Sequence, residues 1–155
     1  RRDAVHGHRC GVALAAWLRR SGGSWLVVGP DEESEPWVRA IARAAGARWV
    51  VARKERHGDR SVTVHLPDLP PGSRAVIVDD IASSGVTIAA TARALRARGA
   101  RPIDAIVSHA IFAPGARARI RAAGVRRLVS CDTIPHPTNA IGVAALLAAA
   151  LPRSA

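Results

Sequence analysis

The chain has 155 residues, 48% of them hydrophobic, and this size suits a single domain that can bury a core of its own. Its longest apolar run, residues 140–151, is too short and too rich in alanine for a membrane span, and the first residues lack the pattern of a signal peptide. The formal net charge of +11 would suit a nucleic-acid binder, but the arginines stand singly on predicted helices and aromatic residues are scarce, which argues against nucleic-acid and membrane partners.

Cysteine and methionine usage bears on where the protein acts and how the chain is bounded. Cys10 and Cys131 lie in no metal-binding or redox spacing, which favours a reduced, cytoplasmic protein. The sequence contains no methionine, so Arg1 is not expected to be a translation start, and we expect a fragment or a trimmed product. We expect one domain over residues 1–155, with residues 1–23 as an N-terminal helix at the boundary of that fragment.

Apolar runs alternate with amphipathic helical stretches along the first half of the chain. The pattern predicts a helix over residues 10–20, a strand over 25–28, a helix over 36–45 that Gly46 ends, and a strand over 48–52. A polar loop is expected over residues 53–60. Period-two alternation over residues 61–66 then indicates a short edge or hairpin strand.

The second half continues the alternation. It predicts a strand from residue 74 to the Asp79–Asp80 pair, a helix over 88–98, strands over 103–108 and 127–131, a helix over 115–123 between them, and a final alanine-rich helix. Repeated β-α-β units of this length predict an α/β fold, a mainly parallel sheet flanked by helices on both faces. Ligands of such sheets bind at the carboxyl ends of the strands, so the functional loops should follow Val28, Ala52, Val78 and Cys131.

The most informative segment is residues 74–87, where an apolar strand ends in two carboxylates and runs into a small, hydroxyl-rich turn. Backbone N–H groups at the start of the following helix have no intrahelical partner, so the turn can hold a phosphate. Asp79 and Asp80 are too close to bind that phosphate themselves, because like charges repel, and they suit sugar hydroxyls or a divalent cation. We therefore expect a ribose 5-phosphate ligand. Alternatively, the carboxylates cap a helix and the turn is an ordinary connection.

Two earlier loops carry charges suited to phosphate chemistry. Asp31 follows the first strand, where it could hold a Mg²⁺ ion that bridges phosphate oxygens or could simply be favoured by the helix dipole. Lys54 and Arg56 alternate in an extended segment, so both could face a polyphosphate transition state from a mobile lid. Otherwise that segment is an exposed, solvated turn.

Two further polar residues lie at the ends of later strands. We expect His109 to hydrogen-bond a neighbouring backbone group. Thr133 could reach a ribose phosphate or only shape its turn.

Residues 76–81 and 83–87 together resemble the diphosphate-sugar signature of the type I phosphoribosyltransferase fold. Residues 29–31, 54–58, 108–112 and 132–136 extend the resemblance, over about residues 25–147, to the C-terminal half of ribose-phosphate pyrophosphokinases. The resemblance implies a Mg²⁺-dependent transfer of diphosphate from ATP to ribose 5-phosphate, giving phosphoribosyl pyrophosphate and AMP. It also implies a homo-oligomer.

The same resemblance implies a role for each matching position. Asp79 and Asp80 would hold the ribose hydroxyls, and Asp31 would bind the metal. Lys54 and Arg56 would be catalytic and stabilise the transition state. The 5-phosphate would lie on the turn formed by Ser83, Ser84, Gly85, Val86 and Thr87.

The chain also departs from the family pattern. Ser83 stands where many members have an acid, Val86 stands where a second glycine is common, and residues 32–34 replace the usual glycines. The family enzyme has two similar domains, and its N-terminal domain supplies much of the ATP site, so this domain alone could be incomplete or inactive. Two alternatives remain: a small phosphoribosyltransferase of nucleobase salvage, and a non-catalytic regulatory homologue, against which the retained cations Lys54 and Arg56 count.

Overall fold

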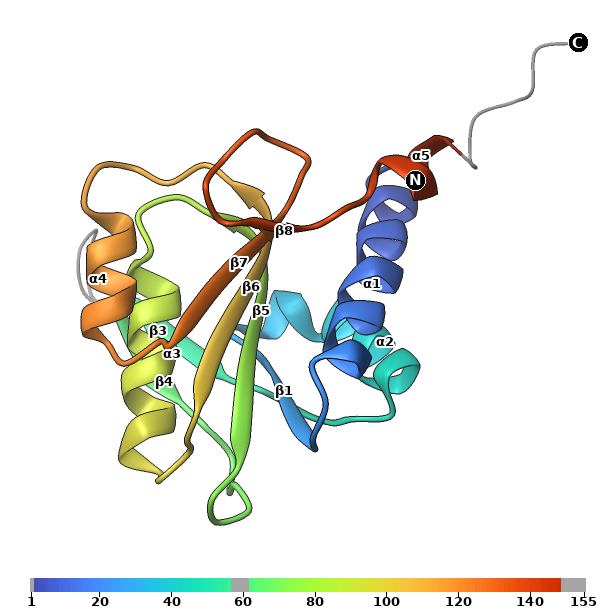
Figure 1. Ribbon diagram of the computed structural model, residues 1–155. Helices are drawn as coiled ribbons and strands as arrows, with labels where there is room; N and C mark the ends of the chain where they lie inside the picture. The colour runs from blue at the N-terminus through green and yellow to red at the C-terminus, as the bar shows by residue number, and fades with distance from the viewer. Residues whose placement is uncertain (1, 57–61, 149–155) are drawn as a thin grey trace, which may run out of the picture.

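The computed structural model describes residues 2–56 and 62–148, and it contains a six-stranded sheet with helices on both faces (Figure 1). The strand order is β2-β1-β5-β6-β7-β8, and all neighbouring strands in it run parallel. These strands are β1 (Trp25–Gly29), β2 (Arg48–Val51), β5 (Arg74–Ala82), β6 (Ile103–Ala110), β7 (Arg127–Cys131) and β8 (Asn139–Ile141). The predicted α/β class with a parallel sheet is confirmed.

Each face of the sheet has its own hydrophobic core. Helices α1 (Arg2–Arg20) and α2 (Glu35–Ala45) cover one face, where Leu14 and Val76 are among the buried residues. Helices α3 (Val86–Ala97) and α4 (Ala116–Ala122) cover the other, where Ile77 is buried. Because successive strand residues point to opposite faces and both faces are covered, β5 is apolar at every position from Ala75 to Val78.

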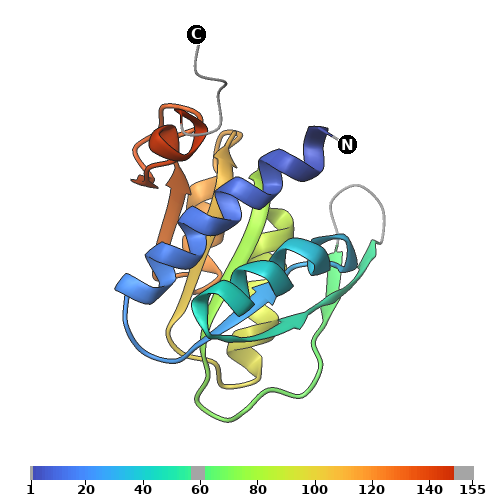
Figure 2. The ribbon, with the colours of Figure 1, turned by 90° about the vertical axis from the view of Figure 1, so that its right-hand side faces the viewer.

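Three elements differ from the sequence-based expectations. Helix α1 begins at Arg2, before the start at residue 10 that the apolar pattern indicated but within the N-terminal helix expected over residues 1–23. The pattern missed this part because the mostly polar residues before Cys10 carry no helical apolar period. Part of the expected polar loop is a strand, β3 (Arg53–Arg56), which pairs antiparallel with β4 (Val62–His65) in a two-stranded ribbon beside the main sheet (Figure 2). Residues 57–60 of that loop lie outside the described residues. The short strand β8 was not expected.

The sequence pattern does not predict strands β3 and β8, for different reasons. Arg53 to Arg56 has no apolar alternation, and the segment is extended because β4 supplies its hydrogen-bond partners in register, Arg53 opposite His65. Strand β8 has only three residues, and side-chain bonds hold it: Ser130 Oγ donates to Asn139 Oδ1 at 2.8 Å. After β8 the chain forms α5 (Ala144–Ala148), which lies beside α1.

The parallel strands place their carboxyl ends at one edge, the upper edge in Figure 1. The loops after β1, β5, β6 and β7 therefore meet there, as expected for a sheet of this kind. Among residues 2–56 and 62–148, none of the helices combines the length and apolar character that crossing a membrane would need.

Candidate functional site

The turn between β5 and α3 forms a hollow at the carboxyl edge. Its lining comprises Asp79, Ile81, Ala82, Ser83, Ser84, Gly85, Val86, Thr87 and Ile88, and its volume is about 170 Å³. Gly85 is the N-cap of α3, and no side chain caps that end, so the first backbone N–H groups of the helix remain available. The weak contact from Val86 N–H to Ser84 Oγ is 3.4 Å long. All five predicted phosphate-binding positions, Ser83 to Thr87, thus line one small hollow.

Glycine is required at position 85 for two separate reasons. Its backbone has a φ of +70°, a conformation that residues with a Cβ rarely adopt. A Cβ there would also lie 2.9 Å from Ile120 Cδ1 and 3.2 Å from the Ala116 carbonyl oxygen, both on α4. The turn therefore packs so closely against α4 that no side chain fits at position 85.

Helix α4 and the loop before it also hold the backbone of the turn. The Arg119 guanidinium donates to the Ser84 carbonyl, and Ala113 N–H donates to the Ser83 carbonyl at 3.1 Å. These bonds engage the carbonyl oxygens of the turn, which would otherwise repel an anion. Sequence reasoning did not identify Arg119 as a site residue. Its only signal was the run of alternating arginines on the helix predicted over residues 115–123.

The two carboxylates at the end of β5 differ in their surroundings. Asp79 is partly buried, whereas Asp80 is exposed, and their carboxylates accept from the next backbone N–H groups, those of Asp80 and Ile81, at 3.0 and 2.7 Å. Burial, together with the negative charges of Asp80 and Asp31, raises the pKa of Asp79 to about 7. The charge of Asp31, in the loop after β1, thus acts on Asp79 at the end of β5.

Asp31 is fixed in the loop after β1. Gly29 allows this loop to turn tightly, because a Cβ at Gly29 would lie 2.1 Å from Ser34 Oγ. The buried Ser34 hydroxyl donates to the Asp31 carbonyl at 2.5 Å and closes the loop on itself. The Asp31 side chain is thereby directed toward the β3–β4 hairpin, where Lys54 Nζ donates to Asp31 Oδ2 at 2.6 Å.

The hairpin carries both predicted catalytic cations. Lys54 is in the middle of β3 and its side chain is only 14% exposed, whereas neighbouring Arg53 is 75% exposed and pairs with Glu32 at 3.3 Å. Arg56 is the last residue of β3, two positions beyond Lys54, so its backbone continues the extended conformation that was expected. The structure pairs Lys54 with Asp31, a contact that the sequence analysis did not predict.

The ends of β6 and β7 are joined by side-chain hydrogen bonds. Thr133 Oγ1 donates to the Ser108 carbonyl at 2.7 Å and lies 2.9 Å from His109 Nδ1. Because the threonine proton is engaged, Nδ1 of His109 carries the proton in this bond and Nε2 is an acceptor when the ring is neutral. His109 therefore bonds a side chain rather than the neighbouring backbone group that was expected.

The carboxylates suit a cation that is shared with a substrate. Among the described residues, no group of three or more His, Cys, Asp or Glu side chains has the geometry to hold a metal ion by itself. Mg²⁺ commonly takes only one or two protein carboxylates and completes its coordination with water and substrate phosphates. Asp31, Asp79 and Asp80 fit that type of site.

Comparisons with known proteins bear on the family and the fold. Residues 11–146 match the family model described as a phosphoribosyl transferase domain. The chain is 33% identical over 134 residues to the ribose-phosphate pyrophosphokinase of Methanopyrus kandleri, covering 86% of this chain and 46% of that relative. The expected resemblance is thus confirmed. The chain spans about half the length of the curated relatives it matches.

Two solved structures illustrate the likeness. Phosphoribosylpyrophosphate synthetase from Mycobacterium smegmatis superposes with a TM-score of 0.67 and 25% identity, covering 82% of this chain and 43% of that one. Orotate phosphoribosyltransferase from Aeropyrum pernix superposes with a TM-score of 0.60 and 29% identity, covering 78% of this chain and 68% of that one.

Proposed function

Because the chain belongs to the phosphoribosyl transferase domain family, we propose that its carboxyl-edge site binds ribose 5-phosphate and supports diphosphate transfer to it from ATP. The products would be phosphoribosyl pyrophosphate and AMP, a transferase reaction of nucleotide biosynthesis. One observation carries the proposal. Asp79 lines a phosphate-sized hollow, and Asp31, whose charge acts on Asp79, is paired with Lys54, which supports neighbouring roles for these groups in binding the sugar and the diphosphate.

The sugar end of the site follows from the β5–α3 turn. The 5-phosphate would accept hydrogen bonds from the free N–H groups of the α3 N-terminus and from Ser83, Ser84 and Thr87, while Arg119 adds positive charge nearby. Asp79 and Asp80 would accept hydrogen bonds from the ribose hydroxyls as carboxylates. The ribose would thereby be oriented with its anomeric hydroxyl toward Asp31 and the hairpin.

The transfer end follows from the hairpin. The anomeric oxygen would form a bond to the β-phosphorus of ATP, the bond from that phosphorus to the α,β-bridging oxygen would break, and the hydroxyl proton would pass to solvent. Lys54 and Arg56 would stabilise the negative charge that develops on the transferred group. Bound Mg²⁺ would neutralise phosphate oxygens, and Asp31, with Asp79 and Asp80 nearby, would hold it.

Two incubations and one binding measurement test this function. The protein is mixed with ATP, ribose 5-phosphate and Mg²⁺, and AMP is measured; it is then mixed with phosphoribosyl pyrophosphate and each nucleobase, and pyrophosphate is measured. Binding of ribose 5-phosphate is measured separately by calorimetry. AMP formation supports the proposal, whereas failure to bind ribose 5-phosphate contradicts it. Binding without either product would indicate a non-catalytic homologue, or a domain that needs the remainder of a two-domain enzyme.

A second candidate is a small phosphoribosyltransferase, which the likeness to orotate phosphoribosyltransferase favours because this chain covers 68% of that structure. In that reaction pyrophosphate leaves and a base takes its place, so pyrophosphate release distinguishes it from the first candidate. We also propose that the protein is a homo-oligomer, which light scattering during gel filtration can test.

A further inference from the structure

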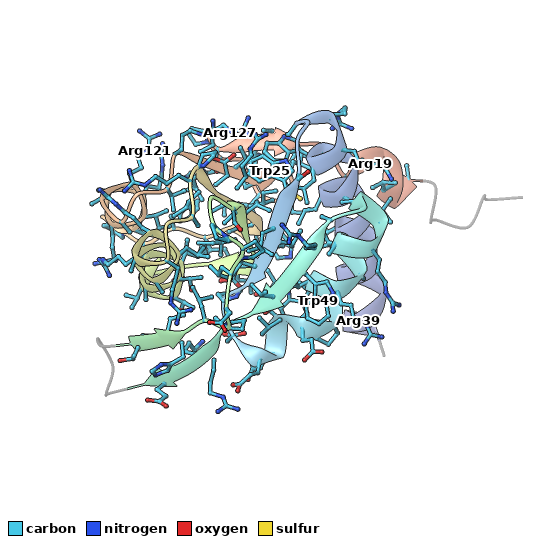
Figure 3. The ribbon with its side chains drawn as sticks, turned by 90° about the horizontal axis from the view of Figure 1, so that it is seen from below. Arg19, Trp25, Arg39, Trp49, Arg121 and Arg127 are labelled. Carbon is cyan, nitrogen blue, oxygen red and sulfur yellow. The ribbon has the colours of Figure 1, made fainter. Side chains whose placement is uncertain are left out.

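A second hollow lies at the opposite edge of the sheet, where β6 and β7 begin. It has a volume of about 180 Å³, and it is lined by Arg96, Arg101, Pro102, Ile103, Gly124 and Arg126. We call it the arginine hollow. Figure 3 shows the molecule from this side, with Arg127 near the start of β7 and Arg121 on α4. The proposed ribose 5-phosphate site lies at the other end of β5, so the two hollows share no residue.

Arg126 is held in a fixed orientation. Its Nε and Nη2 donate to the two carboxylate oxygens of Asp104 at 3.0 and 2.9 Å, and its backbone N–H donates to the Ile103 carbonyl at 2.8 Å. Asp104 itself is fully buried. A guanidinium bound along one side in this way keeps the N–H groups of Nη1 for another acceptor.

The other two arginines come from segments whose backbone is also positioned. Arg96 passes over Gly124, since a Cβ at Gly124 would lie 3.4 Å from both Arg96 Cδ and Arg96 Nη1. Arg101 is tied through its backbone N–H to the Ser73 carbonyl at 2.9 Å. The loop before β6 and the end of α3 therefore place two guanidinium-bearing residues at the rim of one hollow.

The charge around this hollow is not balanced. Asp104 is shared, because Arg127 also donates to Asp104 Oδ2, at 2.9 and 2.7 Å, so one carboxylate serves two guanidinium groups. None of the residues lining the hollow is acidic, and within the described residues Arg96 and Arg101 form no ion pair. Arg126 and Arg127 thus share one buried carboxylate, while Arg96 and Arg101 have no acidic partner there, so positive charge exceeds negative charge around the hollow.

We propose that the arginine hollow binds a small tetrahedral oxyanion of the phosphate class. Guanidinium groups match phosphate oxygens in geometry, and three of them on one hollow would supply charge-assisted hydrogen bonds from several directions. The volume of the hollow favours a free ion over a nucleotide, because it is smaller than the roughly 300 Å³ at which pockets for drug-sized ligands begin. The site is independent of the proposed transferase reaction.

Nuclear magnetic resonance of the ¹⁵N-labelled chain tests the proposal with inorganic phosphate as the probe, at constant ionic strength set with chloride. We expect saturable shifts at the backbone amides of Ile103, Gly124 and Arg126, separate from those of the β5–α3 turn. AMP in a parallel titration should shift the arginine hollow more weakly than phosphate does. A stronger response to AMP would overturn the assignment to a free small anion.

Two variants make the test specific. The double variant Arg96→Gln with Arg101→Gln should weaken phosphate binding at this hollow by about tenfold or more, given the strength of charge-assisted hydrogen bonds. The control Arg121→Gln removes an exposed arginine of α4 that does not line the hollow, and it should leave the affinity unchanged. Equal loss in both variants, or shifts that chloride reproduces, would show general charge screening and overturn the site.

The proposed function is tested by a different part of the same spectrum. Thr87→Val should remove the response of the β5–α3 turn while the amides around Gly124 still respond. Dispersed spectra of all variants show that they are folded. Loss of the turn's response alone therefore concerns the ribose 5-phosphate site, and loss of the Gly124 response alone concerns the arginine hollow.

Discussion

Lys54 Nζ lies 2.6 Å from Asp31 Oδ2, and this ion pair joins the β3–β4 hairpin to the loop after β1. The two side chains are only 14% and 20% exposed, so solvent screens the pair less than an ordinary surface ion pair. Both groups have a proposed second partner, a polyphosphate for Lys54 and a cation for Asp31. We expect substrate and metal to compete with the ion pair, so that binding at one residue releases the other.

Lys54→Ala should lower kcat by about a hundredfold or more while ribose 5-phosphate affinity changes little, because a cation aimed at developing charge acts mainly in the transition state. Turnover and calorimetric binding are measured on the same preparation. Arg53→Ala is the matched control, since Arg53 is the preceding residue of β3, is 75% exposed and pairs with Glu32. Equal losses in turnover and binding for Lys54→Ala would make the hairpin a binding element only.

Asp31→Asn should raise the Mg²⁺ concentration needed for half-maximal thermal stabilisation in the presence of ribose 5-phosphate by about tenfold, a loss equivalent to one carboxylate ligand. The melting temperature is recorded as Mg²⁺ is titrated, so the measurement does not depend on turnover. Glu32→Gln is the control because Glu32 is the adjacent carboxylate and is exposed. An unchanged Mg²⁺ response in Asp31→Asn would mean that Asp31 acts only as the ion-pair partner of Lys54 and does not bind the metal.

The sequence could predict the sheet and the turn because both depend on local patterns. Continuous apolar strands, glycine-ended helices and the Asp-Asp-hydroxyl segment each leave a signal within a few residues. The Lys54–Asp31 pair and the Arg119 bond to Ser84 join residues far apart in the chain, and no local pattern encodes such contacts. Strand β3 was not predicted for the same reason: its extended conformation depends on pairing with β4, a contact that its own residues do not encode.

Asp79 should make the protein less stable as the pH rises from about 4 to about 7. Burial and neighbouring carboxylates raise its folded-state pKa to about 7 from an ordinary value of 3.8, so across that window the folded state holds a proton that the unfolded state has released. Asp79→Asn should therefore remove part of this slope and stabilise the chain above pH 7 by on the order of 2 kcal/mol. Urea unfolding at pH 5 and pH 8 measures the difference. Parallel curves for wild type and Asp79→Asn would contradict it.

Asp104 should show the opposite pH dependence. Burial alone would raise the pKa of this carboxyl, but hydrogen bonds from Arg126 and Arg127 outweigh burial and lower it. Its stabilising contribution is therefore present above the unfolded pKa and is lost as the pH falls into the acid range. Asp104→Asn should cost about 2–4 kcal/mol at pH 7, because two guanidinium groups lose a buried partner.

The control for Asp104 is an exposed carboxylate with a similar partner. Asp68 lies 3.9 Å from an arginine, Arg98, and is fully exposed, so Asp68→Asn should leave the urea midpoint unchanged. Ribose 5-phosphate affinity should also stay unchanged in Asp104→Asn, since Asp104 lies at the start of β6, away from the carboxyl edge. If the two variants had the same midpoint, the buried carboxylate would not contribute to stability as argued.

Gly85→Ala should destabilise the chain by about 2–4 kcal/mol and weaken ribose 5-phosphate binding, because backbone strain and a steric clash act at the same position.

The control variant Gly115→Ala separates the strain from the clash. Gly115 is also a helix N-cap, with a φ of +78°, but a Cβ there would meet nothing within 4 Å. It should cost only the strain, about 1–2 kcal/mol, and leave ligand affinity unchanged. Since a Cβ on Gly85 would press on Ile120 and the Ala116 carbonyl, α4 or the turn would have to move, and the turn carries the proposed phosphate contacts. Equal stability losses in the two variants, measured by urea unfolding, would mean that α4 does not constrain the turn.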